Sequence, residues 1–96
     1  MNSMVSFRSR RDEILSIARR HGAHDVRVFG SVARGEATRN SDVDLLVSTT
    51  DSTSPWFPAE LVVDLESRLG CRVQAVTEEG LYWLLRRRNL REAIPL

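Results

Sequence analysis

Two aspartates at the start of an apolar strand limit what this chain can fold into more than any other feature. Side chains on a strand alternate between its faces, so Asp42 and Asp44 point the same way while Val43 and Leu45 point into a core. Asp is disfavoured in strands, and two carboxylates on one face repel each other unless a cation lies between them. Together they form the hard oxygen site that Mg²⁺ prefers, completed by water and substrate phosphates. We therefore expect Asp42 and Asp44 to bind a divalent metal.

A second motif precedes the aspartates. An apolar strand over residues 25–29 ends at Gly30-Ser31, and ten residues separate Ser31 from the first aspartate. Gly30 lets the backbone approach an anion without a Cβ in the way, and Ser31 offers a hydroxyl and an N–H to a phosphate. Arg34, in a short helix that follows, has the bidentate fork that suits phosphate oxygens. A phosphate site beside a metal site predicts binding of a nucleoside triphosphate by Gly30, Ser31 and Arg34.

Length and composition set outer limits. A chain of 96 residues has room for one domain, and we expect 1–96 to form a single one. All fourteen basic residues are Arg and the net charge is +1, so any phosphate contact comes from Arg, backbone or hydroxyls. No apolar run approaches the ~20 residues that span a bilayer. The single Cys71 forms no internal disulfide, which fits a reducing compartment, and we expect a cytoplasmic location.

The pattern along the chain indicates helices alternating with strands. We expect helices over residues 7–21, 58–69 and 79–92, a short helix over 32–35, and strands over 25–29, 43–47 and 71–76. In the last helix, Leu81, Leu84 and Leu85 are expected to point inward. The connection after residue 29 is too short for a crossover helix, so the first two strands should be antiparallel. The expected fold class is α/β (α+β), a small mixed sheet with helices packed on it.

Together these segments resemble a known family. Gly30-Ser31, ten residues, then Asp42-Val43-Asp44 is similar to the signature of minimal nucleotidyltransferases of the DNA polymerase β superfamily. The resemblance extends to residues 28–36, 73–77 and 90–94. It implies the nucleotidyltransferase fold, with Asp42 and Asp44 as catalytic metal ligands. Small stand-alone members are often antitoxins whose partner is a HEPN-type RNase toxin. The resemblance thus implies transfer of AMP from ATP, with Mg²⁺, to a tyrosine hydroxyl of that toxin.

The chain departs from the family pattern at one position. The family normally places a third carboxylate where Gln74 stands here, and that acid binds metal and accepts the proton of the attacking hydroxyl. Gln74 has a carbonyl oxygen but no charge and no useful basicity. Loss of a positioned general base typically costs ~10²–10⁴-fold in rate. Two interpretations stay open: a slow AMP-transferring antitoxin, or an antitoxin that neutralises its toxin by direct binding alone.

A third interpretation belongs to another class of function. The cluster Arg86–Arg91, with Tyr82 and Trp83 beside it, has the charge and aromatic content that bind single-stranded nucleic acid. Cations near a helix C-terminus also complement the helix dipole, and three consecutive arginines point around the helix rather than to one face. We therefore favour a protein partner over nucleic acid and keep nucleic-acid binding through Arg86–Arg91 as the alternative. Aromatics and arginines also concentrate at protein interfaces, so Trp56 and Trp83 are candidates for contact with the toxin.

Overall fold

The computed structural model describes residues 3–51 and 53–96. The helices are α1 (Met4–Ser9), α2 (Arg11–Arg20), α3 (Gly30–Arg34), α4 (Ala59–Leu69), the single 3₁₀ turn η1 (Glu78–Gly80) and α5 (Arg86–Glu92). The strands are β1 (Ala23–Phe29), β2 (Val43–Thr49), β3 (Val73–Val76) and β4 (Ile94–Pro95).

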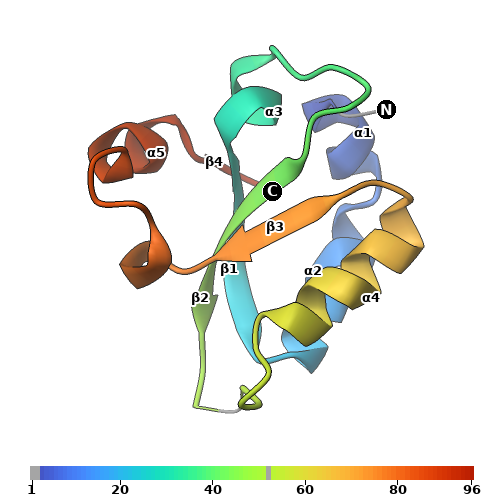
Figure 1. Ribbon diagram of the computed structural model, residues 1–96. Coiled ribbons are helices and arrows are strands. Elements are labelled where there is room, and N and C mark those ends of the chain that lie inside the picture. The colour runs from blue at the N-terminus through green and yellow to red at the C-terminus, as the bar shows by residue number, and fades with distance from the viewer. Residues whose placement is uncertain (1–2, 52) are drawn as a thin grey trace.

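The four strands form one mixed sheet in the order β3-β2-β1-β4 (Figure 1). β1 is antiparallel to both β2 and β4, and β2 is parallel to β3. A parallel neighbour needs a crossover connection, which α4 supplies between β2 and β3. The expected α/β class, mixed sheet and antiparallel first pair are all confirmed.

The two faces of the sheet carry different cores. On one face, α2 and α4 lie together against the sheet in Figure 1, over a cluster of apolar side chains that includes Ile14, Ile17, Val28, Val43, Leu45, Leu61 and Leu65. The opposite face carries a smaller cluster of Phe29, Leu46 and Leu81, with Leu90 and Ala93 packed against it. Because α5 covers only part of this second face, Asp44 and Gln74 stay accessible there: Asp44 is half-buried and Gln74 is exposed.

The helix expected over 7–21 is two helices. Ser3 caps the first of them by accepting the Ser6 N–H at 3.1 Å, earlier in the chain than the sequence pattern predicts. The break falls at Arg10, whose N–H donates to the Phe7 carbonyl at 3.1 Å in a tight closing turn. The Arg10 guanidinium then reaches across to the Arg68 carbonyl at 2.7 Å, which joins the break to the end of α4.

The C-terminal third differs most from expectation. In place of one helix over 79–92, the chain forms η1, a turn, and then the shorter α5. Leu81 adopts an extended backbone (φ −68°, ψ 139°) and enters the core beneath the sheet. That excursion ends the helix, so the expectation that Leu84 and Leu85 point inward is wrong: they are 62% and 42% exposed. The short tail is the edge strand β4, which the sequence pattern did not predict.

The helix α4 follows its sequence signals closely. Pro58 precedes its first residue, and Gly70 ends it in the left-handed region at φ +70°. Its buried residues are Leu61, Leu65 and Leu69, four residues apart on one face of the helix. Within residues 3–51 and 53–96, no helix has the length and apolarity needed to span a bilayer.

Candidate active site

The start of β2 brings an acid directly against the Gly-Ser turn. Asp44 pairs with Phe29 on one side and with Gln74 on the other. A Cβ built on Gly30 would lie 2.2 Å from Asp44 Oδ2, so the carboxylate occupies the space that any other residue at position 30 would need. Gly30 also has φ +76°, in the left-handed region that favours glycine. The structure therefore joins the two sequence motifs at one point.

Asp42 lies just before β2 and is more exposed than Asp44. Its Oδ1 is 3.0 Å from Arg72 Nε, because the parallel register sets the residues before β2 and β3 side by side. The Val43 N–H donates to the Arg72 carbonyl at 2.9 Å and continues that alignment. Asp42 is thus paired with Arg72, and a metal ion would have to replace this arginine as its counterion.

The environment of Asp44 opposes its negative charge. Partial burial raises the pKa of the Asp44 carboxyl, and the nearby charge of Asp42 raises it further. Arg34 acts in the opposite direction, and Glu92 adds a smaller repulsion. A site that places a second acid near Asp44 at this cost to the ionisation of Asp44 is suited to a cation that neutralises both carboxylates.

The donor set fits a magnesium ion shared with a substrate. Gln74 is exposed on β3 beside Asp44, and its amide oxygen would be a neutral ligand in addition to the two carboxylates. The part of the chain that the structure describes has no group of three or more His, Cys, Asp or Glu that could hold a metal by itself. Mg²⁺ commonly takes one or two protein carboxylates and completes its shell with water and phosphate oxygens, and Asp42 and Asp44 match that pattern.

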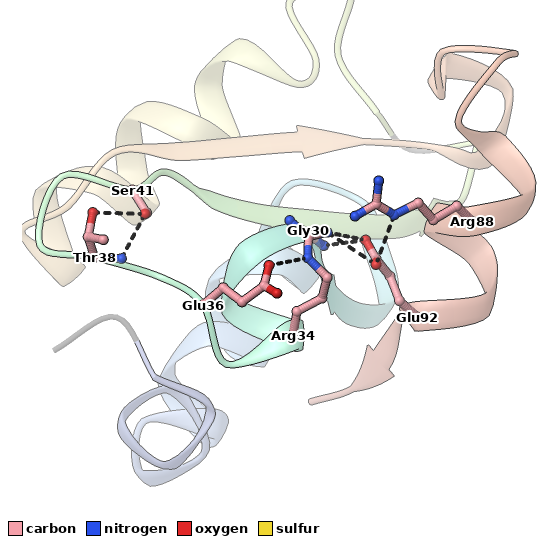
Figure 2. A network of polar contacts seen from close by, with 7 residues as sticks. All are labelled: Gly30, Arg34, Glu36, Thr38, Ser41, Arg88 and Glu92. Atoms are coloured by element: carbon pink, nitrogen blue, oxygen red, sulfur yellow. Dashed lines mark hydrogen bonds and ion pairs between the residues drawn. The ribbon is translucent and has the colours of Figure 1, made fainter.

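The helix α3 carries the remaining predicted nucleotide ligands. Ser31 is its second residue and Arg34 its last. Arg34 Nε donates to Glu36 Oε1 at 2.8 Å, and Nη1 donates to both oxygens of Glu92 at 3.0 and 3.2 Å. The Gly30 N–H also donates to Glu92 Oε1, at 3.0 Å (Figure 2). The hydrogen bond to Glu36, and after it those to Glu92, raise the pKa of Arg34, which stays a cation.

Sequence reasoning missed Glu92, the acid that joins α5 to the Gly-Ser turn. The available signal was its position in residues 90–94, one of the segments that carry the family resemblance. Arg39, the other arginine between the Gly-Ser turn and the aspartates, is not brought to the turn. It is exposed and lines a pocket on the α1 side with residues such as Ser6 and Arg10.

The basic and aromatic segment is exposed. Trp83 and Tyr82 are 76% and 58% exposed, with ring centroids 6.0 Å apart. Arg86–Arg88 begin α5 instead of ending it, so the explanation by the dipole of a helix C-terminus is wrong for them. Trp56, on the long connection before α4, is 73% exposed.

Known proteins resemble this chain in both sequence and fold. A nucleotidyltransferase domain family matches residues 11–96. The protein adenylyltransferase MntA of Thermococcus cleftensis is 40% identical over 75 residues, which cover 78% of this chain and 76% of that protein. A solved structure assigned as a minimal nucleotidyltransferase is 51% identical, with a TM-score of 0.82 over 98% of this chain and 96% of that one.

A more distant neighbour confirms the fold. It is a toxin–antitoxin crystal structure with AMP-PNP, 24% identical, with a TM-score of 0.72 over 88% of this chain and 69% of that one. The matched family model spans both sequence motifs, the whole sheet and the helix that carries Glu92. This chain therefore belongs to the nucleotidyltransferase domain family.

Proposed function

We propose that this protein is the antitoxin of a toxin–antitoxin pair and that it transfers AMP from ATP to a tyrosine hydroxyl of a HEPN-type toxin. The observation that carries the proposal is the contact between the Asp44 carboxylate and Gly30, which sets a metal-binding acid beside a phosphate-binding turn. The relative from T. cleftensis is named a protein adenylyltransferase, and a neighbour of the same fold is a toxin–antitoxin structure with an ATP analogue.

Each residue has a part in that reaction. Gly30, Ser31 and Arg34 would bind the β- and γ-phosphates, and Asp42 and Asp44 would hold Mg²⁺. Bound there, Mg²⁺ supplies neutralisation of the charge that develops on the phosphate oxygens. The tyrosine oxygen attacks the α-phosphorus, the bond from that phosphorus to the bridging oxygen of the β-phosphate breaks, and pyrophosphate leaves with the electron pair. The tyrosine proton passes to solvent water.

Gln74 supports a second candidate function. It stands beside Asp44, where a general base would lie, and an amide cannot accept the tyrosine proton. The antitoxin would then act by covering its toxin, with the exposed Trp83 and Tyr82 as contact residues. In either case the protein works as a single 1–96 domain in the cytoplasm, where ATP, Mg²⁺ and the reducing conditions suited to Cys71 are found.

Mass spectrometry of the partner separates the two candidates. The toxin encoded beside this gene is incubated with the protein, ATP and Mg²⁺, and its intact mass and RNase activity are measured. Transfer predicts a mass increase of one AMP on a tyrosine and loss of RNase activity that persists after the antitoxin is removed. An inactive toxin of unchanged mass, with activity restored on separation, would contradict transfer and support binding alone.

The matched control is Asp44→Asn. It keeps the side-chain shape but removes the metal-binding charge, so it should abolish the mass increase while leaving the complex intact. If Asp44→Asn transfers AMP as the unaltered protein does, the assigned site is wrong.

A further inference from the structure

One carboxylate connects the groups to which we assign the phosphates of the nucleotide. Glu92 lies on α5, 62 residues after Gly30 in the chain. Its Oε1 accepts the Gly30 N–H at 3.0 Å and Arg34 Nη1 at 3.0 Å, and its Oε2 accepts the same Nη1 at 3.2 Å (Figure 2). The Glu92 side chain is only 15% exposed. A partly buried carboxylate with this many partners holds them in one arrangement.

The contacts of Arg34 fix the orientation of its guanidinium group and so the direction in which Nη2 points. The guanidinium is planar, so hydrogen bonds from Nε to Glu36 and from Nη1 to Glu92 set the orientation of the whole group. Neither of these bonds uses Nη2. Arg88 Nε lies 3.7 Å from Glu92 Oε2, so one carboxylate offsets the charges of two arginines that would otherwise repel each other.

The carboxylate itself is held firmly. Leu90 and Ala93, on either side of Glu92 in sequence, pack against the apolar cluster of Phe29 and Leu46. The strand β4 follows immediately and pairs with β1. The backbone at Glu92 is thus anchored on both sides, and the hydrogen bonds to Gly30 and Arg34 hold the side chain itself.

We propose that Glu92 is a positioning residue of the nucleotide site, which orients Arg34 and the Gly30 turn to receive the phosphates. The inference rests on the proposed function, because it requires that nucleotide binds at this turn. Glu92 touches neither the nucleotide nor the reacting atoms and acts through Arg34. Outer residues that orient a first layer of ligands typically contribute about 10–100-fold to binding or activity.

The test is nucleotide affinity, measured by calorimetric titration of the 96-residue protein with AMP-PNP and Mg²⁺. Glu92→Gln keeps the shape and an amide oxygen that can accept the Gly30 N–H, but it removes the charge that orients Arg34. We expect affinity about tenfold weaker than that of the unaltered protein. Unchanged or tighter affinity would overturn the proposal, because a carboxylate that only repels or competes with phosphate gives that result.

A double-mutant cycle tests whether Glu92 acts through Arg34. In the Arg34→Gln background, Glu92→Gln should cause no further loss of AMP-PNP affinity. Losses that simply add would assign Glu92 a general structural role and overturn the inference.

Glu66→Gln is the matched structural control. Glu66 Oε2 accepts the Val73 N–H at 3.0 Å and joins α4 to β3 on the opposite face of the sheet. Both Gln variants should lower the unfolding temperature, but only Glu92→Gln should weaken AMP-PNP binding. If the unaltered protein binds no AMP-PNP, the proposed function itself fails; if it binds and Glu92→Gln binds equally, only the positioning role fails.

Discussion

The Asp44 carboxylate fills the space that a side chain on Gly30 would occupy. Its Oδ2 lies 2.2 Å from the ideal Cβ position, closer than real Cβ atoms approach other atoms. Because Asp44 is also a predicted metal ligand, the requirement for glycine at position 30 is at once steric and functional. Any side chain there displaces the acid.

Gly30→Ala should therefore damage both stability and binding. The left-handed backbone alone costs a non-glycine residue about 1–2 kcal/mol, and the clash with Asp44 adds to that. We expect a loss in the free energy of unfolding above this range, measured by urea denaturation, together with loss of binding of AMP-PNP with Mg²⁺.

Gly35→Ala is the matched control for this substitution. Gly35 has nearly the same φ, +73°, but a Cβ there would meet nothing within 4 Å. It should cost only the backbone term, about 1–2 kcal/mol, and leave nucleotide binding intact. Equal effects of the two substitutions would mean that the Asp44 contact is unimportant.

Asp44→Asn should stabilise the protein at neutral pH while abolishing metal binding. The pKa of Asp44 is raised by burial and by Asp42, so the folded state binds the proton more tightly than the unfolded state does. The free energy of unfolding therefore falls as pH rises from the ordinary Asp pKa through the raised pKa of Asp44. Above that range the ionised Asp44 carboxylate destabilises the fold. The Asn variant should unfold at a higher temperature near pH 7.

The same variant makes a pH-dependent prediction. The unfolding temperature of Asp44→Asn should exceed that of the unaltered protein by less and less as pH falls through the raised pKa of Asp44. The difference, which is the advantage of the variant, should vanish below the ordinary Asp value of 3.8. Saturating Mg²⁺ should also reduce the advantage, by stabilising only the unaltered protein. Thermal melts from pH 3 to 7 measure both effects, and an advantage independent of pH would contradict the assigned cause.

Gln74→Glu should increase AMP transfer. The parallel register places residue 74 beside Asp44, so a carboxylate there can accept the tyrosine proton and share the metal. A positioned base is expected to raise the rate by ~10²-fold or more, measured as AMP incorporated into the toxin over time. Gln74→Ala, which adds no base, is the control. No gain from Glu would mean that proton transfer does not limit the reaction.

Asp64→Asn should lower stability without touching the site. The hydrogen bond to His21, 3.1 Å from Asp64 Oδ2, lowers the pKa of this acid, and Arg20 contributes in the same direction. A lowered pKa stabilises the fold above the ordinary Asp value and loses that effect as pH falls through the folded pKa. The variant should melt earlier than the unaltered protein at neutral pH, with the gap closing in acid and AMP-PNP affinity unchanged.

The elements with local signals were predictable. Pro58 and Gly70 bracket α4, and the alternation around Val26 and Val28 marks β1, because these signals depend on nearby residues alone. The spacing of Ser31 and the two aspartates also anticipated one site, since a strand, a short turn and an antiparallel return leave few other arrangements. The family resemblance supplied the position of Gln74 beside Asp44.

The missed features all depend on distant partners. Leu81 leaves the helical path to reach Phe29 and Leu46, and periodicity carries no information about that partner. Ile94 pairs with Val28, 66 residues earlier in the chain, and so adds β4 to the edge of the sheet. Glu92 looked like an ordinary helix residue until the fold brought it to Gly30. Local sequence cannot reveal contacts that exist only once the sheet has formed.

The short edge strand β4 has a consequence for handling this protein. Leu96 donates its N–H to the Val26 carbonyl at 3.0 Å, and its own carbonyl accepts Arg11 Nε at 3.1 Å. These bonds tether the far end of the segment that carries Glu92. Removal of residues 94–96, or a bulky group attached to them, would release this tether and disturb the position of Glu92. Activity would then fall even though every residue assigned to contact the substrate was still present.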